Sequence, residues 1–123
     1  RTQLQLFESS TTSLPLPIWI KDLDGKMLYM NDYCINMVLK PLGMKFSDQV
    51  GKTDLEIWGK ELADQYRKTD ERIIRYKKPI ESVEPVLTRA GDVYYVDVIK
   101  FPRLFEGIVV GVAGVIKGNH KKE

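Results

Sequence analysis

The 123-residue sequence predicts an α+β fold, in which helices lie on one face of a five-stranded antiparallel sheet. Three observations lead to this prediction. Two extended segments lie near the start of the chain, helical patterns occupy its middle, and three apolar extended segments with short connections follow. Because short connections join antiparallel neighbours, the strands are expected to form one sheet, in the order ββαααβββ.

The first elements are a short helix and a hairpin. Residues 2–13 form a weakly amphipathic stretch that prolines bring to an end, which predicts a short N-terminal helix. Residues 17–22 are rich in β-forming side chains, and the turn signal Asp24-Gly25 follows them. Residues 26–30 are therefore expected to return as the second strand.

The middle of the chain carries capping signals and one strongly amphipathic pattern. Asn31 or Asp32 can cap a helix that ends at a proline and a glycine. Thr53 and Glu56 have the spacing of a capping box, in which each side chain binds the other residue's backbone N–H, so a second short helix is expected there. Residues 60–77 place apolar side chains at three-to-four spacing and predict the longest helix.

The remainder of the chain predicts three strands, over residues 80–88, 93–101 and 108–116, with a loop over residues 102–107. The last strand is apolar on both of its alternating faces, so both faces must be covered. The helices of the middle region can cover only one of them. The N-terminal helix or a second copy of the domain is expected to cover the other.

Composition and charge exclude several classes of protein. With 43% hydrophobic and 29% charged residues, the chain has the composition of a globular domain rather than a disordered one. A net charge of +2 provides no basic surface of the kind that binds phosphate backbones, so we expect no direct nucleic-acid binding. No apolar run is long enough for a membrane span, so no membrane partner is expected. The single cysteine, Cys34, excludes an internal disulfide and fits a cytoplasmic location.

Five short motifs carry a resemblance to a known family. They are Lys21-Asp22-Leu23-Asp24-Gly25, Met30-Asn31, Gly51-Lys52-Thr53-Asp54, Lys100-Phe101-Pro102 and Gly107-Ile108-Val109-Val110-Gly111. In this order and spacing, from about Leu14 to Ile116, the chain resembles the PAS domains of bacterial sensory proteins. One departure follows the last strand, where many such domains have an Asp-Ile-Thr-like signature that couples the sheet to an output helix. Here the chain has Val115-Ile116-Lys117-Gly118.

The resemblance implies a division of the chain and a function. Residues 14–117 would form the PAS sensor domain, residues 1–13 an N-terminal helix or linker, and residues 118–123 a tail or linker to an absent output domain. The implied function is to bind a small ligand or to relay a signal within a larger bacterial signalling protein, such as a histidine kinase, a cyclic-dinucleotide enzyme or a transcription factor. The alternative is a ligand-free dimerisation module of such a protein.

The resemblance also guides the expectation about cofactors and catalysis. Haem-binding PAS domains usually place an axial histidine on the long helix, whereas the only histidine here is His120, beyond the last strand. Flavin-binding relatives hold a reactive cysteine in an Asn-Cys-Arg-Phe-like motif on a later helix, which Cys34 does not match. We therefore expect no haem, no flavin and no protein-ligated zinc, which leaves an unidentified small molecule as the candidate ligand. With His120 on no rigid element, the domain is expected not to be an enzyme.

A ligand pocket is expected between the sheet and the long helix, where PAS relatives bind small molecules. The candidate ligand-binding residues are Met37, Trp58, Leu62, Tyr66, Ile73, Tyr95 and Lys100. Simple core packing is the alternative for each of them. Tyr66 stands out because a buried phenol needs a hydrogen-bond partner, which a ligand could supply. If the strands pair about a turn at Ala90-Gly91, Lys100 lies opposite Glu81, and an ion pair between them is favoured over a lysine aimed at an anionic ligand.

A homodimer is the expected assembly. The last strand presents two apolar sets on opposite faces, Val110, Val112, Gly114 and Ile116 on one and Val109, Gly111, Ala113 and Val115 on the other. The long helix covers only one set, and monomers rarely expose such a row. The stretch around Leu4 and Phe7 is too short to be a stable helix alone. Two such helices paired across a two-fold axis would cover both sheets, and the alternative is a helix folded back on its own sheet.

Overall fold

The computed structural model describes residues 3–121 and contains one five-stranded antiparallel sheet, with strands in the order β2-β1-β5-β4-β3. The strands are β1 (Ile18–Asp22), β2 (Met27–Met30), β3 (Ile80–Leu87), β4 (Val93–Phe105) and β5 (Ile108–Asn119). The α-helices are α1 (Gln3–Thr11), α2 (Asp32–Cys34), α3 (Asp54–Trp58) and α4 (Lys60–Tyr76). This arrangement confirms the predicted α+β fold class. The terminal parts of the regions expected over 1–13 and 118–123 lie outside the described residues.

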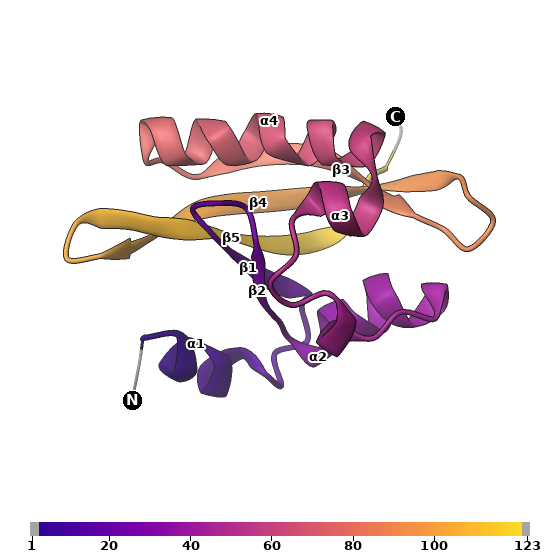
Figure 1. Ribbon diagram of the computed structural model, residues 1–123, viewed down its shortest axis with the longest axis horizontal. Coiled ribbons are helices and arrows are strands. Elements are labelled where there is room, and N and C mark those ends of the chain that lie inside the picture. Colours follow the sequence, from indigo (N-terminus) through magenta and orange to yellow (C-terminus); the bar gives the residue numbers. More distant parts are fainter. Residues whose placement is uncertain (1–2, 122–123) are drawn as a thin grey trace.

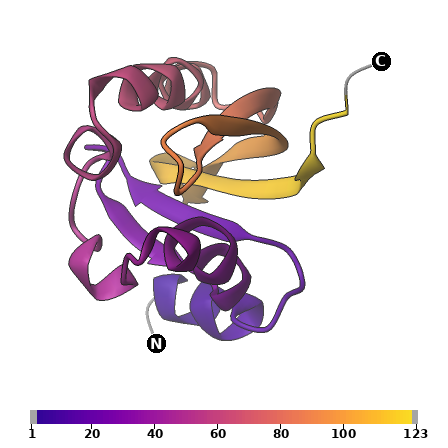
Figure 2. The same ribbon diagram turned by 90° about the vertical axis from the view of Figure 1, so that its right-hand side faces the viewer.

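The helices cover both faces of the sheet rather than one. Figure 1 shows α4 along one side of the sheet and α1 on the opposite side, and the turned view separates the same two helices (Figure 2). On the α1 side, Leu4 and Phe7 pack against Ile20, Tyr29 and Ala113. The N-terminal helix therefore covers the outer face of its own sheet. The expected pairing of two such helices across a two-fold axis stays a prediction.

Strand alternation in β1 sends neighbouring side chains into the two layers. Ile20 is fully buried on the α1 side. Trp19 and Lys21 point the other way and line the space beneath α4. Since β1 pairs with β2 on one side and β5 on the other, it is a central strand and both of its faces are covered. The side chain of Lys21 therefore points into the interior from a strand in the middle of the sheet.

The local capping signals are present as hydrogen bonds. Asn31, and not Asp32, caps α2, because its side-chain oxygen accepts from the backbone N–H of Cys34. The capping box of α3 is present in both directions, between Thr53 and Glu56. Beyond α2 the helix does not continue regularly: a π-helical turn covers Ile35–Leu39 and a 3-10 turn covers Lys40–Leu42. Pro41 lies in that last turn, where a residue without an N–H cannot extend the helical hydrogen bonds.

Strands β4 and β5 are longer than predicted, and the loop expected over residues 102–107 is mostly strand. Pro102 suggested a loop, yet it lies in β4 and pairs with Val112 of β5. The pairing of β3 with β4 ends at Ile80 and Lys100, so beyond that point β4 has a free edge. A proline can occupy an edge because no partner there requires its missing N–H. Within the described part of the chain, no helix is both long and apolar enough to cross a membrane.

Candidate functional site

A cavity of about 60 Å³ lies between the sheet and the helices, close to the predicted place. Side chains from every strand, from α2, α3 and α4, and from the π-helical turn line it. Its walls are mostly apolar, and they include Trp19, Met27, Met30, Val38, Val86 and Val98. The space exceeds what a single water molecule needs, so the core is incompletely filled here.

Three of the seven candidate residues line this cavity: Trp58, Tyr66 and Lys100. The structure places Met37, Leu62, Ile73 and Tyr95 elsewhere. Met37 packs against the hydrophobic cluster around Val96, beside the cavity. Leu62 and Ile73 are buried side chains of α4 that do not reach the cavity. Tyr95 is 47% exposed, because strand alternation turns it away from the face that carries Val96 and Lys100.

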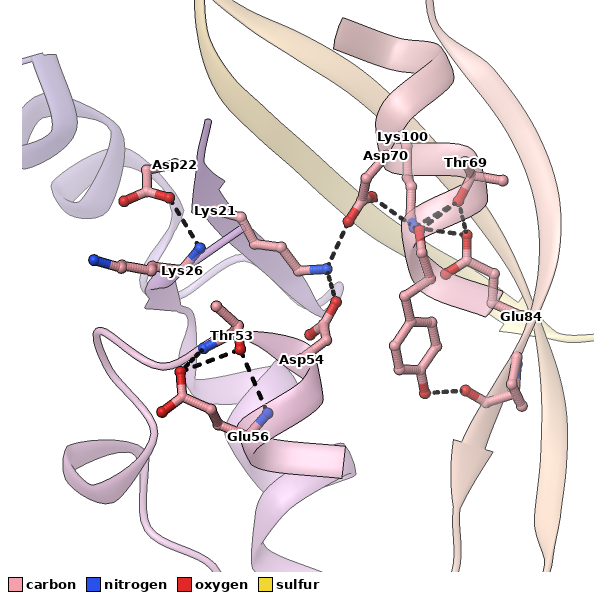
Figure 3. Close-up of polar contacts among 12 residues, drawn as sticks. Lys21, Asp22, Lys26, Thr53, Asp54, Glu56, Thr69, Asp70, Glu84 and Lys100 are labelled. Atoms are coloured by element: carbon pink, nitrogen blue, oxygen red, sulfur yellow. Dashed lines mark hydrogen bonds and ion pairs between the residues drawn. The ribbon is translucent and has the colours of Figure 1, made fainter. Parts of the chain in front are cut away.

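Two buried lysines form a continuous ion-pair network on one wall of the cavity (Figure 3). Lys21 from β1 contacts the carboxylates of Asp54 and Asp70, the latter at 2.8 Å from Nζ to Oδ2. Lys100 from β4 lies 2.8 Å from Asp70 Oδ1 and 2.9 Å from Glu84 Oε2. Asp70 therefore bridges the two ammonium groups. The network joins β1, β3, β4, α3 and α4.

The expected ion pair between Lys100 and Glu81 is wrong in its partner. In the register of β3 and β4, Ile80 lies opposite Lys100, and Glu81 lies opposite Ile99. Glu81 instead contacts Lys117 at 3.0 Å on the surface. A shift of one residue turns a strand side chain to the other face, which is why Glu81 cannot reach the buried lysine.

Hydrogen bonds complete the surroundings of Lys100. Its Nζ donates to Thr69 Oγ1 at 2.7 Å and to the backbone oxygen of Tyr66 at 3.2 Å. The Thr69 hydroxyl donates onward to Glu84 Oε2 at 2.9 Å, and Ser82 Oγ donates to the same oxygen at 2.8 Å. Four oxygen atoms thus surround the three N–H groups of Lys100.

Burial and charge act differently on the members of the network. Burial favours the neutral amine of Lys21, but Asp70 and Asp54 outweigh it and raise the pKa of Lys21 above its ordinary value. Burial opposes ionisation of Asp70, yet Lys21 and Lys100 on either side hold the pKa of Asp70 below its usual 3.8. Burial raises the pKa of Asp54, and contact with Lys21 offsets only part of that effect. Asp70 is thus the better-stabilised carboxylate of the two.

The hydroxyl of Tyr66 has a hydrogen-bond partner within the protein. Its Oη donates to the backbone oxygen of Pro85 at 2.5 Å. Lys21 Nζ and Lys100 Nζ lie 5.7 and 5.9 Å from the centroid of its ring, within the range of cation–π attraction. Burial, followed by the nearby carboxylates, raises the pKa of Tyr66, so the phenol keeps its proton. The oxygen retains its capacity to accept a hydrogen bond.

Sequence reasoning missed four charged residues of the cavity wall and its network: Lys21, Asp54, Asp70 and Glu84. One signal was available for Lys21, because it directly follows three β-forming residues and so lies in a strand. Alternation places its side chain on the same face of that strand as Trp19. Asp54 and Asp70 gave no such signal. They lie 33 and 49 residues from Lys21 along the chain, and surface exposure is the ordinary expectation for a helical aspartate.

Comparison with known proteins identifies the family. Residues 11–117 match the family described as PAS fold. The chain belongs to the PAS fold family. An uncharacterised protein of Sinorhizobium fredii, y4lL, is 30% identical over 87 residues, and the match covers 71% of this chain but 10% of that protein.

Two solved structures illustrate how closely this PAS domain follows the family fold. The PAS domain of Bordetella pertussis BvgS matches with a TM-score of 0.75 at 22% identity, over 98% of this chain and 88% of that one. The Vibrio cholerae VqmA–ligand–DNA complex matches with a TM-score of 0.73 at 19% identity, over 96% of this chain and 52% of that one. The chain thus spans about half of VqmA, and at these identities the likeness shows the fold.

The VqmA structure corrects the expectation about nucleic acids. From the weak net charge we expected that this chain has no nucleic-acid partner. That expectation is wrong as an exclusion, because VqmA is a protein with this fold that is solved in complex with DNA. The charge of a sensor domain says little about what the rest of such a protein binds.

Proposed function

We propose that this PAS domain is a sensory module that binds a small ligand in the cavity and relays the event to an output domain of a larger signalling protein. The observation that carries the proposal is a cavity of about 60 Å³ with mostly apolar walls and one charged wall. Ligand sites combine these two features, because apolar walls supply affinity and a few polar groups fix orientation. The VqmA structure, which is a complex with a ligand, supports the same use of the fold.

A relay path leads from the cavity to the N-terminal helix. Cys34 lines the cavity, and its backbone N–H donates to Asn31 Oδ1 at 3.0 Å. The same oxygen accepts from the N–H of Ile18, also at 3.0 Å. The amide nitrogen of Asn31 donates to the backbone oxygens of Thr11 and Leu16, at 3.1 and 2.7 Å. A shift of α2 on ligand binding would therefore pull on the end of α1.

The proposed role is not catalytic. Burial raises the pKa of the Cys34 thiol to about 12, so the reactive thiolate does not form near neutral pH. His120 contacts Asp97 at 2.7 Å on the surface, and neither residue lines the cavity. The domain would therefore change its partners' activity by binding and conformation rather than by chemistry of its own.

Native mass spectrometry of freshly purified protein tests the proposal, with two variants at one position. Cys34→Leu adds side-chain atoms to the cavity, whereas Cys34→Ala leaves it open. We expect a bound small molecule on the wild type and on Cys34→Ala, and its loss from Cys34→Leu. Urea unfolding checks that both variants fold. A spectrum of the unliganded mass alone, with no small molecule in the denatured extract, would contradict the proposal.

A further inference from the structure

The charged groups on the cavity wall do not balance. Three carboxylates share two ammonium groups through contacts of 2.9 Å or less: Asp54, Asp70 and Glu84 with Lys21 and Lys100. All five side chains are at most 14% exposed. When every group is ionised, three negative charges face two positive ones. An excess buried charge is costly, so the site favours something that neutralises it.

This wall also has more free hydrogen-bond acceptors than free donors. Lys100 is surrounded by four oxygens and has no N–H to spare, and Lys21 has one N–H beyond its two carboxylate partners. Acceptors are more plentiful. Asp54 and Glu84 each use only one of their oxygens for hydrogen bonds within residues 3–121, and the Tyr66 oxygen donates to Pro85 but accepts nothing there. A ligand that brings donors fits this wall better than one that brings acceptors.

The remaining walls suit the apolar body of such a ligand. Both tryptophans of the chain, Trp19 and Trp58, line the cavity together with Met27 and Met30. Aromatic faces attract cations through the ring quadrupole, and they attract anions poorly. The cavity thus combines an aromatic and thioether surface with an acceptor-rich, net negative wall.

We propose that the ligand of this cavity is a small organic ammonium ion, whose N–H groups donate to Asp54, Glu84 and the Tyr66 oxygen. The inference rests on the proposed function, in which the cavity binds a ligand, and adds the charge of that ligand. A cationic ligand is the opposite of the alternative considered for Lys100, an anionic ligand. The N–H groups of Lys100 already donate to Asp70 and its other oxygen neighbours, so none remains for an anion.

Three probes with one apolar body separate charge from shape: isobutylammonium, isobutanol and isovalerate. Because both tryptophans line the cavity, tryptophan fluorescence and the two indole N–H signals in NMR report binding at this site. We expect isobutylammonium to bind about tenfold more tightly than isobutanol, which corresponds to about 1.4 kcal/mol. Isovalerate should bind more weakly than isobutanol.

Two matched substitutions test where the preference arises. Asp54→Asn removes the excess negative charge and should abolish the preference for isobutylammonium over isobutanol while isobutanol still binds. Asp64→Asn is the control, because Asp64 pairs with Lys60 on the exposed side of α4, away from the cavity. It should retain the full preference. Urea unfolding of each variant confirms that the fold is present.

A pH titration adds a second readout for Asp54. The charged or titratable groups that surround it on the packed elements are Lys21, Tyr66, Asp70, Glu84 and Lys100. Burial raises the pKa of Asp54, so a proton neutralises it before Asp70 as the pH falls. The proton and the ammonium ion then compete for the same excess charge. The ammonium preference should decline with falling pH in the wild type, and Asp54→Asn should show no such decline.

The outcomes distinguish the inference from the proposed function. Equal binding of isobutanol and isobutylammonium, or tightest binding of isovalerate, would overturn the ammonium inference while a ligand-binding cavity stands. Binding of none of the three at millimolar concentration would overturn the inference too. The proposed function would then be judged separately by native mass spectrometry. Loss of the preference in Asp64→Asn as well as Asp54→Asn would show that it arises outside the cavity.

Discussion

The two aspartates that contact Lys21 should differ sharply in what they contribute to stability. Asp70 lies between two buried ammonium groups, and its lowered pKa shows that its ionised form is stabilised by folding. Among the cations of residues 3–121, Asp54 contacts Lys21 alone, and its raised pKa shows that its ionised form is destabilised. The substitutions Asp70→Asn and Asp54→Asn remove one charge each from the same network.

The expected magnitudes follow from what each substitution leaves behind. Breaking a buried ion pair by removing one partner costs about 3–5 kcal/mol. After Asp70→Asn, Lys21 retains Asp54 and Lys100 retains Glu84, so we expect a loss at the lower end, about 3 kcal/mol. After Asp54→Asn, Lys21 retains Asp70, and the excess negative charge disappears. That loss should stay below about 1 kcal/mol.

Urea unfolding at pH 7, followed by tryptophan fluorescence, measures the difference. With a slope of about 1.5 kcal/mol per molar urea, a loss of 3 kcal/mol lowers the midpoint by roughly 2 M. Asp64→Asn serves as the surface control, because its pair with Lys60 is exposed and screened by solvent, so the midpoint should stay close to that of the wild type. An equal lowering of the midpoint by Asp54→Asn and Asp70→Asn would contradict the expected difference between the two aspartates.

The pH dependence of the two variants should also have opposite signs. The folded-state pKa of Asp70 lies below its unfolded value of 3.8, so its contribution is complete above that value and is lost as the pH falls through the lower, folded-state pKa. The advantage of the wild type over Asp70→Asn should therefore shrink in acid. The folded-state pKa of Asp54 lies above 3.8, so the cost of its charge is relieved as the pH falls toward that value. Over that range, the free energy of unfolding of the wild type should rise relative to that of Asp54→Asn.

Three further predictions concern packing, reactivity and colour. Gly114→Ala should destabilise the domain by about 1–3 kcal/mol in urea unfolding, because a Cβ there would lie 2.2 Å from the Trp19 ring. Gly118→Ala on the same strand is the control: its Cβ meets nothing within 4 Å, and it should change stability by less than about 0.5 kcal/mol. Cys34, only 2% exposed and with a pKa near 12, should react with a thiol reagent at pH 8 no faster than the domain unfolds. The purified domain should be colourless, as measured by its visible absorption spectrum after gel filtration.

Clear results would contradict each of these three. Equal midpoints for the two glycine variants would mean that the Trp19 ring moves aside without cost. Labelling of Cys34 that is fast and independent of urea would mean that the cavity opens without unfolding. A visible absorption band that stays with the protein would mean that a haem or flavin binds without the side chains expected for it.

Elements whose hydrogen bonds and faces are local could be predicted from the sequence. The capping box of Thr53 and Glu56 and the amphipathic pattern of α4 involve residues at most four positions apart, so their chemistry is visible in the sequence. The hairpin turn after β1 is equally local. The order of strands and helices followed from these elements, and with it the α+β fold.

The sequence indicated the existence of the cavity but only part of its wall. Trp58, Tyr66 and Lys100 were predicted because large or charged side chains on elements facing one core are natural wall residues. Tyr95 was also predicted but does not line this cavity, since strand alternation turns it outward. The choice of Asn31 over Asp32 as the cap also needed the structure, because it depends on contacts with Thr11 and other distant residues.

The ion-pair network and the covering of the outer face depend on contacts between segments that are distant in the sequence. Lys21 meets Asp54 and Asp70 across 33 and 49 residues of chain, and Lys100 meets Asp70 rather than Glu81 because of the exact strand register. A shift of one residue would turn these side chains to the other face, and no local pattern fixes that register. The position of α1 likewise depends on a sheet face that is complete only when β1 and β5, the first and last strands, pair. Contacts between distant segments depend on the packing of the whole chain, so no single stretch of the sequence specifies them.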